Sequence, residues 1–361
     1  MIENWKAFLA EHGIVDTGVI DNNQQAAFES GESNVLSSPS NFGLIKVSGE
    51  DAENFLQNQL SNDIRKVTET SHQASAWCTP KGRIIATFRI FKRQDSYYLS
   101  VAGDLLEHVI KKLQMYIMMS KVTLEDVSGS IVQFTFSGKN ADKALQQILS
   151  NEKENANQAI EVPANSEQAI LYNSAENSPN GNTNNKVNIL RYSDATPRFE
   201  IFADIEAAKK LWLACKKDSQ IAADNNWHYL NILAGLPHIS QASSESWIPQ
   251  MVNYIAIGGV DFKKGCYPGQ EVVARLNYLG KTKRRMYRLL IDTDTLPEIN
   301  DSIASESDND AGKILNCALN PENKVEALAV LKIAEAEKGA LALANNQAKA
   351  TLLPLPYAIE E

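Results

Sequence analysis

The chain has 361 residues, of which 43% are hydrophobic and 22% charged, so it can fold into two or three globular units. Its formal net charge of −9 argues against general nucleic-acid binding, because such binding depends on neutralising phosphates with Lys and Arg. We expect a cytoplasmic protein without a membrane span, since no apolar run reaches roughly 18 residues, no signal peptide is visible, and the four cysteines form no C-x-x-C pair.

The first predicted elements lie between residues 42 and 117. FGLIKV (42–47) alternates like a strand, and Ser48 and Asp51 are spaced as a capping box before an apolar helical face at 52–60. The alternating runs 84–91 and 97–101 predict a β-hairpin. Asp104, with Glu107 three residues later, predicts a second capped helix over 106–117.

Strands and helices continue to alternate in the second half of the chain. IVQFTF (131–136) and RFEIF (198–202) read as strands, and 141–149 and 227–233 read as helices, the latter ending at Gly235. Residues 151–188, rich in Asn, Glu, Ser and Gln, predict an excursion loop. Short apolar runs after residue 288 predict a small terminal β-domain. The pattern indicates an α+β architecture.

The segment DFKKGCYPGQEVVAR (261–275) is the most informative one. Its glycines and Pro-Gly turn precede a helix that we expect to begin at Gln270. Cys266 would then lie near the positive end of that helix and beside two lysines, which would lower the pKa of its thiol. The alternative is a buried, inert Cys266, with Glu271 and Arg275 forming an ordinary i, i+4 pair.

Basic residues are concentrated in the same part of the chain. Between Lys263 and Arg288 we count eight of them against one acid, Glu271. This excess predicts a local site for an anion, with a solvated face or an inter-domain seam as the alternative. The eight residues are Lys263, Lys264, Arg275, Lys281, Lys283, Arg284, Arg285 and Arg288.

KGCYPGQEVVAR resembles the K-G-C-[YF]-x-G-Q-E signature of the YgfZ family, bacterial relatives of a mitochondrial iron–sulfur assembly factor. The flanking segments SGEDAENFLQNQLSNDI and WCTPKGRIIATFRIF resemble the family as well. The resemblance implies a T-protein-like folate-binding module of two intertwined α+β parts over 1–285, with an inner subdomain at about 130–215. A C-terminal small β-barrel would follow over 286–361, and tetrahydrofolate or a derivative would bind in a central channel.

The resemblance also implies which residues act. Cys266 would be the functional thiol, and no metal site is expected because the five histidines have no ligand spacing. Trp77 either stacks on a pterin or belongs to the core, and Arg198 and Glu200 face either the pocket or an exposed side of a sheet. The residues expected to bind folate are Lys264, Gly265, Tyr267, Gly269, Gln270, Glu271, Arg275, Trp77 and Arg198.

The implied function is that of a folate-dependent accessory protein that matures or repairs iron–sulfur enzymes, including enzymes that modify tRNA. Its partners would be folate, iron–sulfur assembly proteins and client enzymes, with no stable binding of nucleic acid. The T protein places acidic residues where KGRIIATF has Ala86 and Thr87, and one-carbon transfer needs a positioned acid or base. We therefore do not expect a classical enzyme. The alternatives are a tetrahydrofolate-dependent one-carbon transferase and direct RNA binding through 281–288.

Overall fold

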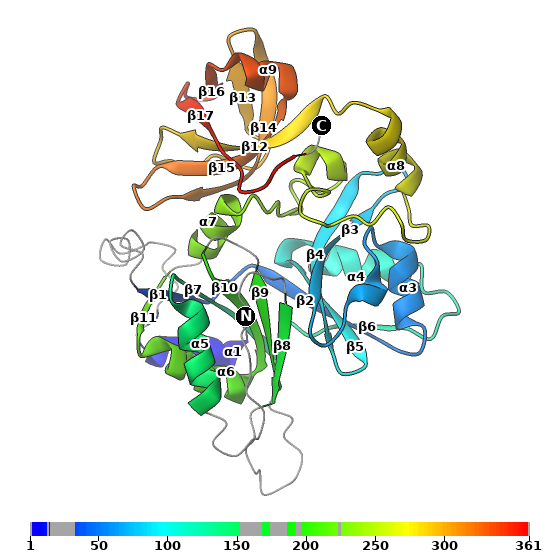
Figure 1. The fold of residues 1–361 in the computed structure, drawn as a ribbon, viewed down its shortest axis with the longest axis vertical. Coiled ribbons are helices and arrows are strands. Elements are labelled where there is room, and N and C mark those ends of the chain that lie inside the picture. Colours follow the sequence, from blue (N-terminus) through cyan, green and yellow to red (C-terminus); the bar gives the residue numbers. More distant parts are fainter. Residues whose placement is uncertain are drawn as a thin grey trace, which may run out of the picture.

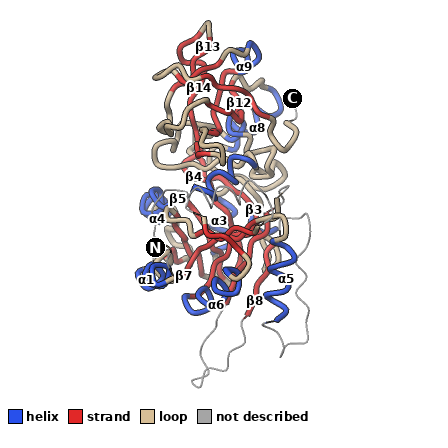
Figure 2. The backbone as a smooth tube through the Cα atoms, turned by 90° about the vertical axis from the view of Figure 1, so that its left-hand side faces the viewer, coloured by secondary structure: helices blue, strands red, loops and turns tan. Residues whose placement is uncertain are grey.

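A computed structural model describes residues 2–12, 14, 33–151, 168–173, 186–192, 196–222 and 225–359. Two open sheets form the lower part of the molecule in Figure 1, and a closed barrel stands above them. Figure 2, turned by 90°, shows the same order from barrel to sheets. No helix among the described residues is both long and apolar enough to cross a lipid bilayer.

The five-stranded sheet has the order β3-β4-β5-β2-β6. Its alternating apolar residues and those of helices α3 (Ala52–Gln59) and α4 (Leu106–Gln114) share one hydrophobic core. The predicted hairpin is confirmed, because β4 pairs with β5 in antiparallel register. The strands are β2 (Phe42–Ser48), β3 (His72–Cys78), β4 (Ile84–Arg93), β5 (Ser96–Ala102) and β6 (Thr123–Asp126).

The six-stranded sheet has the order β11-β1-β7-β10-β9-β8. Helices α1 (Glu3–Glu11), α5 (Ala141–Asn151) and α6 (Ile205–Lys216) cover one of its faces around a core that includes Trp5 and Trp212. The strands are β1 (Asn34–Ser37), β7 (Ile131–Ser137), β8 (Gln168–Asn173), β9 (Lys186–Tyr192), β10 (Arg198–Asp204) and β11 (Ser219–Ile221).

The other faces of the two sheets meet each other. Phe91 of β4 stacks on Phe202 of β10 with ring centroids 4.7 Å apart, inside a cluster that also contains Trp227 of α7 (Asn225–Leu233). The chain places β1 in one sheet, β2 to β6 in the other, and β7 to β11 in the first again. The expected α+β fold of two intertwined parts is thus confirmed.

The barrel closes in the order β12-β15-β14-β13-β16-β17 around its own apolar core, which confirms the expected C-terminal β-barrel. It is preceded by α8 (Gln270–Leu279), the helix expected at Gln270. Its elements are β12 (Arg284–Ile291), β13 (Ser302–Ser305), β14 (Asp308–Leu319), β15 (Val325–Lys332), α9 (Ile333–Lys338), β16 (Leu341–Leu343) and β17 (Lys349–Leu353).

Both predicted helix caps are wrong. Neither α3 nor α4 has a side-chain cap, because each candidate carboxylate binds a backbone N–H from a distant segment instead. Asp51 Oδ2 accepts from Lys121 at 2.8 Å, and Asp104 Oδ2 accepts from Gln241 at 3.0 Å. The capping hydrogen bond within the helix competes here with a tertiary hydrogen bond to the same carboxylate, and residue spacing alone predicts only the first.

The predicted loop at 151–188 is also wrong in part. Gln168–Asn173 forms β8, which pairs in antiparallel register with β9, and β9 already begins at Lys186. The sequence QAILYN is typical of a strand, but the polar residues on both sides of it dominate the composition of 151–188, and that composition predicts a loop. Residues 152–167 and 174–185 lie outside the described residues.

Candidate functional site

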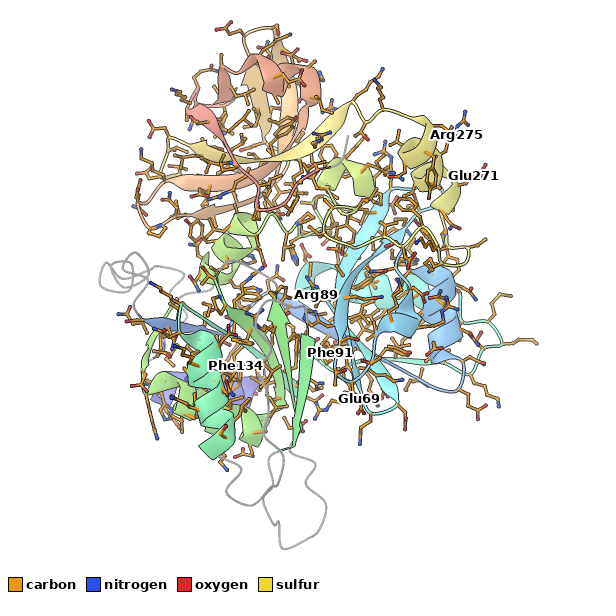
Figure 3. The ribbon with its side chains drawn as sticks, in the orientation of Figure 1. Glu69, Arg89, Phe91, Phe134, Glu271 and Arg275 are labelled. Atoms are coloured by element: carbon orange, nitrogen blue, oxygen red, sulfur yellow. The ribbon has the colours of Figure 1, made fainter. Side chains whose placement is uncertain are left out.

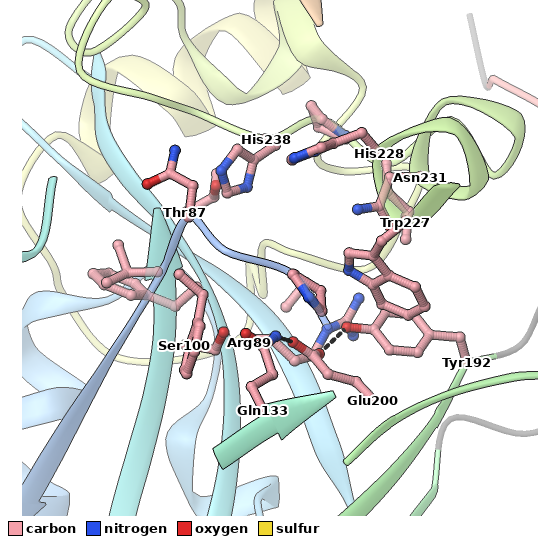
Figure 4. Close-up of a pocket in the computed structure, with 18 of the residues that line it drawn as sticks. Thr87, Arg89, Ser100, Gln133, Tyr192, Glu200, Trp227, His228, Asn231 and His238 are labelled. Atoms are coloured by element: carbon pink, nitrogen blue, oxygen red, sulfur yellow. Dashed lines mark hydrogen bonds between the residues drawn. The ribbon is translucent and has the colours of Figure 1, made fainter. Parts of the chain in front are cut away.

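A pocket lies where the two sheets meet beneath α7 (Figure 4). The pocket and its open mouth together span about 790 Å³, a volume that includes adjoining solvent. The five-stranded sheet, the six-stranded sheet, α7 and the segment 236–238 all contribute to its wall. Its polar lining consists of Asn41, Thr87, Arg89, Ser100, Gln133, Tyr192, Glu200, Trp227, His228, Asn231, His238 and Tyr254.

Glu200 is a buried carboxylate at one end of this pocket. The Tyr192 hydroxyl donates to Glu200 Oε2 at 2.6 Å, and Gln133 Nε2 donates to Oε1, as the dashed lines in Figure 4 show. Burial raises the pKa of Glu200, whereas these hydrogen bonds and the charges of Arg89 and Arg198 oppose the rise. Burial therefore outweighs the hydrogen bonds and the arginine charges in its effect on the pKa of this carboxylate.

The second oxygen-bearing group at this end is the amide of Gln133. Its Nε2 is used by Glu200, but its Oε1 is buried and has no hydrogen-bond partner among the described residues. Burying a polar acceptor without a partner costs about 1–3 kcal/mol, so such an atom calls for a donor from water or from a ligand. Gln133 Oε1 and the Glu200 carboxylate together offer acceptors to a ligand that carries N–H groups.

Arg89 is oriented in the pocket by a buried histidine. His72 Nε2 lies 2.7 Å from the carbonyl oxygen of Arg191, and His72 Nδ1 lies 3.4 Å from Arg89 Nη1. Burial, followed by the charge of Arg89, lowers the pKa of His72 to about 3, so the ring is neutral. Its Nε2–H then donates to the carbonyl and its Nδ1 accepts from Arg89. The guanidinium also lies 4.6 Å over the ring of Tyr192.

Arg198 forms the wall behind the pocket. It is buried, donates from Nη1 to Asn231 Oδ1 at 2.7 Å, and lies between two aromatic rings. Its Cζ is 4.5 Å from the ring centroid of Tyr192 and 4.7 Å from that of Trp227. Of the two arrangements open for Arg198 and Glu200, the structure places Glu200 in the pocket lining and Arg198 directly behind it.

The opposite end of the pocket carries hydroxyl and imidazole groups instead of carboxylates. Thr87 lines it and accepts the backbone N–H of Ile239 at 3.3 Å, while Ala86 packs into the core on the other side of the strand. Burial lowers the pKa of His238 to about 4. Among the described residues that line the pocket, Glu200 carries the only carboxylate. None of the described lining residues beside Thr87 therefore offers a carboxylate that could move a proton.

The Cys266 loop lies elsewhere. Within the described chain, no residue from 261 to 288 lines this pocket. Figure 3 shows Arg89 between the sheets and Glu271 and Arg275 on α8, away from it. No ion pair joins Glu271 and Arg275 in the part of the chain that is described. The structure thus separates the residues predicted around Cys266 from Arg198, which was predicted with them.

Lys264 anchors the loop rather than lining the pocket. Its buried Nζ donates to the carbonyl oxygen of Gln57 at 2.5 Å and to that of Leu60, at the C-terminal end of α3. A cation is favourable there because the last carbonyls of a helix are otherwise unpaired. Burial lowers the pKa of the Lys264 ammonium to about 8.

The rest of the loop presents Cys266 to solvent. Cys266 and Gly265 are exposed, whereas the neighbouring Tyr267 is buried and its hydroxyl has no partner among the described residues. Gly269 has φ +80°, and a Cβ there would lie 2.4 Å from the carbonyl oxygen of Thr79, so only glycine fits. Gln270 then begins α8 and donates its N–H to the carbonyl of Tyr267 at 3.2 Å.

Trp77 takes the core role of its two alternatives. It is 1% exposed, packs among the core residues of the five-stranded sheet, and donates to Gln59 Oε1 at 3.3 Å. Sequence reasoning did not predict Arg89, Gln133 or Tyr192 as site residues. The available signal was a polar or charged residue inside an otherwise apolar strand, such as the glutamine in IVQFTF and the glutamate in RFEIF.

Comparisons with known proteins agree with this fold. Residues 32–220 match the family described as the GCVT N-terminal domain. A "tRNA-modifying protein YgfZ" from Enterobacter sp. (strain 638) is 28% identical over 329 residues, which cover 90% of this chain and 94% of that protein. The solved structure of glycine cleavage system aminomethyltransferase T from Bartonella henselae is similar over 90% of this chain and 86% of its own, with a TM-score of 0.65 and 14% identity.

Proposed function

Because the chain belongs to the YgfZ-like family that carries the GCVT N-terminal domain, we propose that it is a folate-binding accessory protein supporting iron–sulfur enzymes. Through those enzymes it would support tRNA modification, as the name of the Enterobacter relative suggests. The four cysteines are free, which suits the reducing cytoplasm in which we place this function.

The acceptor pair at the end of the pocket is the observation that carries the folate proposal. The pyrimidine ring of a pterin has neighbouring N–H donors, and Gln133 Oε1 is a buried acceptor that needs one. The Glu200 carboxylate beside it would accept a second donor in a charge-assisted hydrogen bond. Phe42, Phe88 and Tyr254 in the lining suit a flat aromatic ligand.

The charges around the pocket also suit folate. Arg89 is the cation in the lining, and it lies over Tyr192 beside Glu200, where its charge would help to keep the carboxylate that accepts from the pterin ionised. The basic segment 263–288 supplies no residue to this lining. We therefore assign folate to the pocket alone. The exposed cations of the basic segment would contact something other than folate.

The pocket does not favour the alternative of a one-carbon transferase. Thr87 stands at the end opposite Glu200, at a position where the T protein is expected to carry an acidic residue, and a threonine hydroxyl cannot replace that acid at neutral pH. Glu200 already accepts from Tyr192 and Gln133 and binds rather than transfers. When bound, folate would supply a carrier for one-carbon units, and the chain's residues would hold it.

Cys266 is the second part of the proposal. The loop holds its thiol in solvent by anchoring Lys264 and Tyr267 on either side and by turning sharply at Gly269. We assign the other predicted loop residues, Gly265, Gln270, Glu271 and Arg275, to presenting this thiol. A single cysteine is too few ligands for a cluster, so any cluster would be shared with a partner.

Titration of the purified protein with tetrahydrofolate under anaerobic conditions tests the folate half. We expect saturable binding by calorimetry, competed by the oxidised pterin-containing ligand folic acid. A monoglutamate and a polyglutamate form should both bind, because the acceptors that carry the proposal bind the pterin. Absence of heat with both forms, at concentrations far above physiological ones, would remove folate as the ligand.

Complementation tests the thiol half. In a host that lacks its own homologue, Cys266→Ser should accumulate as folded protein and fail to restore tRNA methylthiolation. Cys317→Ser is the matched control, since Cys317 is partly buried in the barrel and bonds the carbonyl of Pro297. Full rescue by Cys266→Ser would show that the thiol has no functional role.

A further inference from the structure

The outward face of α8 is unpartnered in the described structure. Five of its exposed residues form one helical stripe, at positions i, i+1, i+4, i+7 and i+8, and the exposed Asn277 lies outside it. The inner face is occupied, because Val273 is buried and its carbonyl accepts from Gln250 Nε2 at 2.6 Å. The stripe consists of Glu271, Val272, Arg275, Tyr278 and Leu279.

Three of these five side chains are large and apolar. Val272 is 42%, Tyr278 67% and Leu279 84% exposed. Three exposed apolar side chains of this size are unusual on a helix that is only ten residues long. Tyr278 is held in place, since its ring packs edge-on against Phe262 with centroids 5.7 Å apart. A rigid, exposed aromatic side chain is the kind of anchor that protein interfaces use.

Cations are concentrated in the segment of the chain that contains this stripe. Lys263, Arg275, Lys281 and Lys283 are exposed, and none of them forms an ion pair within the described chain. Glu271 is the single acid among them, although the whole chain carries a net charge of −9. The α8 face therefore combines apolar contact area with a local positive charge, and Cys266 is exposed four residues before the helix begins.

We propose that the α8 face docks an acidic polypeptide segment with apolar side chains, contributed by a partner protein. This rests on the proposed role of Cys266, because docking would bring that segment beside the thiol. The unpaired cations match an acidic partner, and Leu279 and Val272 match its apolar residues. Nucleic acid fits less well, since a phosphate backbone makes no apolar contact with the exposed aliphatic side chains of Val272 and Leu279.

Thiol–disulfide exchange measures this docking without knowledge of the natural partner. The probe is a synthetic amphipathic peptide of Glu and Leu that ends in a cysteine joined to 2-nitro-5-thiobenzoate. The Cys266 thiolate attacks the peptide sulfur, the new disulfide joins protein and peptide, and the coloured thiobenzoate leaves with the electron pair. Because docking raises the local concentration, the Glu peptide should react at least about tenfold faster than a matched Lys peptide.

Substitutions on α8 should remove this preference. Arg275→Glu combined with Lys281→Glu should bring the two peptide rates together, whereas Lys6→Glu combined with Lys349→Glu, with the same change in net charge, should not. Leu279→Ala should slow the Glu peptide, and Leu213→Ala, at an exposed site on α6, should leave it unchanged. Alkylation of Cys266 by neutral iodoacetamide should be the same in all variants, which separates docking from thiol reactivity.

Three results would overturn the proposal. They are equal rates for the acidic and basic peptides, equal effects of the α8 and control variants, and loss of the preference on adding single-stranded RNA. Binding of a fluorescent Glu peptide to Cys266→Ser protein keeps the test independent of the thiol. Folate titration of the α8 variants should be unchanged, so failure of the docking proposal and failure of the folate proposal give different results.

Discussion

Glu200→Gln is the most direct perturbation of the proposed folate site. Glutamine keeps the size of the side chain but removes its charge, and its amide turns one of two acceptor oxygens into a donor. In the wild type those oxygens accept from Tyr192 and Gln133 and are available to N–H groups of a ligand. The variant must therefore lose at least one charge-assisted hydrogen bond to the ligand.

The expected loss of affinity follows from that count. A hydrogen bond to a charged group contributes about 1.5–3 kcal/mol, and each 1.4 kcal/mol corresponds to about tenfold in Kd. Glu200→Gln should thus weaken tetrahydrofolate binding by roughly 10- to 150-fold in an anaerobic calorimetric titration. Folding should survive, because the substitution also removes the cost of burying a carboxylate, which is the cause of its raised pKa.

The pH dependence provides a second readout of the same residue. The pKa of Glu200 is raised above its ordinary value of 4.5, so the carboxylate gains its proton at a higher pH than a surface glutamate does. If the ionised carboxylate accepts a hydrogen bond from folate, the affinity of the wild type for folate should fall as the pH is lowered through that raised pKa. The Glu200→Gln variant should lack this titration.

Glu125→Gln is the matched control, since Glu125 lies on β6, pairs with Lys46 at 3.0 Å and does not line the pocket. It should bind folate as the wild type does. Wild-type affinity in Glu200→Gln, to within about twofold, would refute the assignment of the acceptor pair to the pterin.

Three further predictions concern stability and reactivity. Gly269→Ala should lower the free energy of unfolding in urea by about 1–3 kcal/mol, because the φ of Gly269 is +80° and a new Cβ would meet the carbonyl of Thr79. Gly265→Ala is the control: its Cβ would lie in open space, so the free energy of unfolding should change by less than about 0.5 kcal/mol. Cys266 should alkylate faster than the other three cysteines in mass-spectrometric labelling, because burial raises the pKa of Cys78 and Cys215 to about 12 and that of Cys317 to about 11; equal rates would contradict this. The pKa of His238 is lowered from 6.5 to about 4, so its contribution to stability is complete above pH 6.5 and is lost as the pH falls toward 4. His238→Asn should therefore reduce the slope of the unfolding free energy against pH by up to one proton in this range. An unchanged slope would show that the pKa of His238 is not lowered by folding.

The folate-site proposal depends on residues that sequence reasoning reached only in part. Glu200 and Arg198 were recognised as alternate positions of one strand, but strand alternation alone cannot tell a pocket from a solvent-exposed face. The helix caps predicted at Asp51 and Asp104 failed for a related reason. Each carboxylate binds a backbone N–H that lies 70 or 137 residues further along the chain, and no local window contains that donor.

The sequence by itself determined the alternation of strands and helices, the start of α8 at Gln270 and the presence of a small terminal β-domain, because these depend on local periodicity and turn residues. That this domain is a barrel was implied only by the family resemblance. The sequence also carried the glycine that the Cys266 loop requires at position 269. Only the tertiary structure brought Arg89 of β4, Gln133 of β7 and Glu200 of β10 to one pocket and separated them from the basic segment. The physical reason is that these strands belong to two sheets that pack face to face, so the pocket is made by contacts distant in sequence.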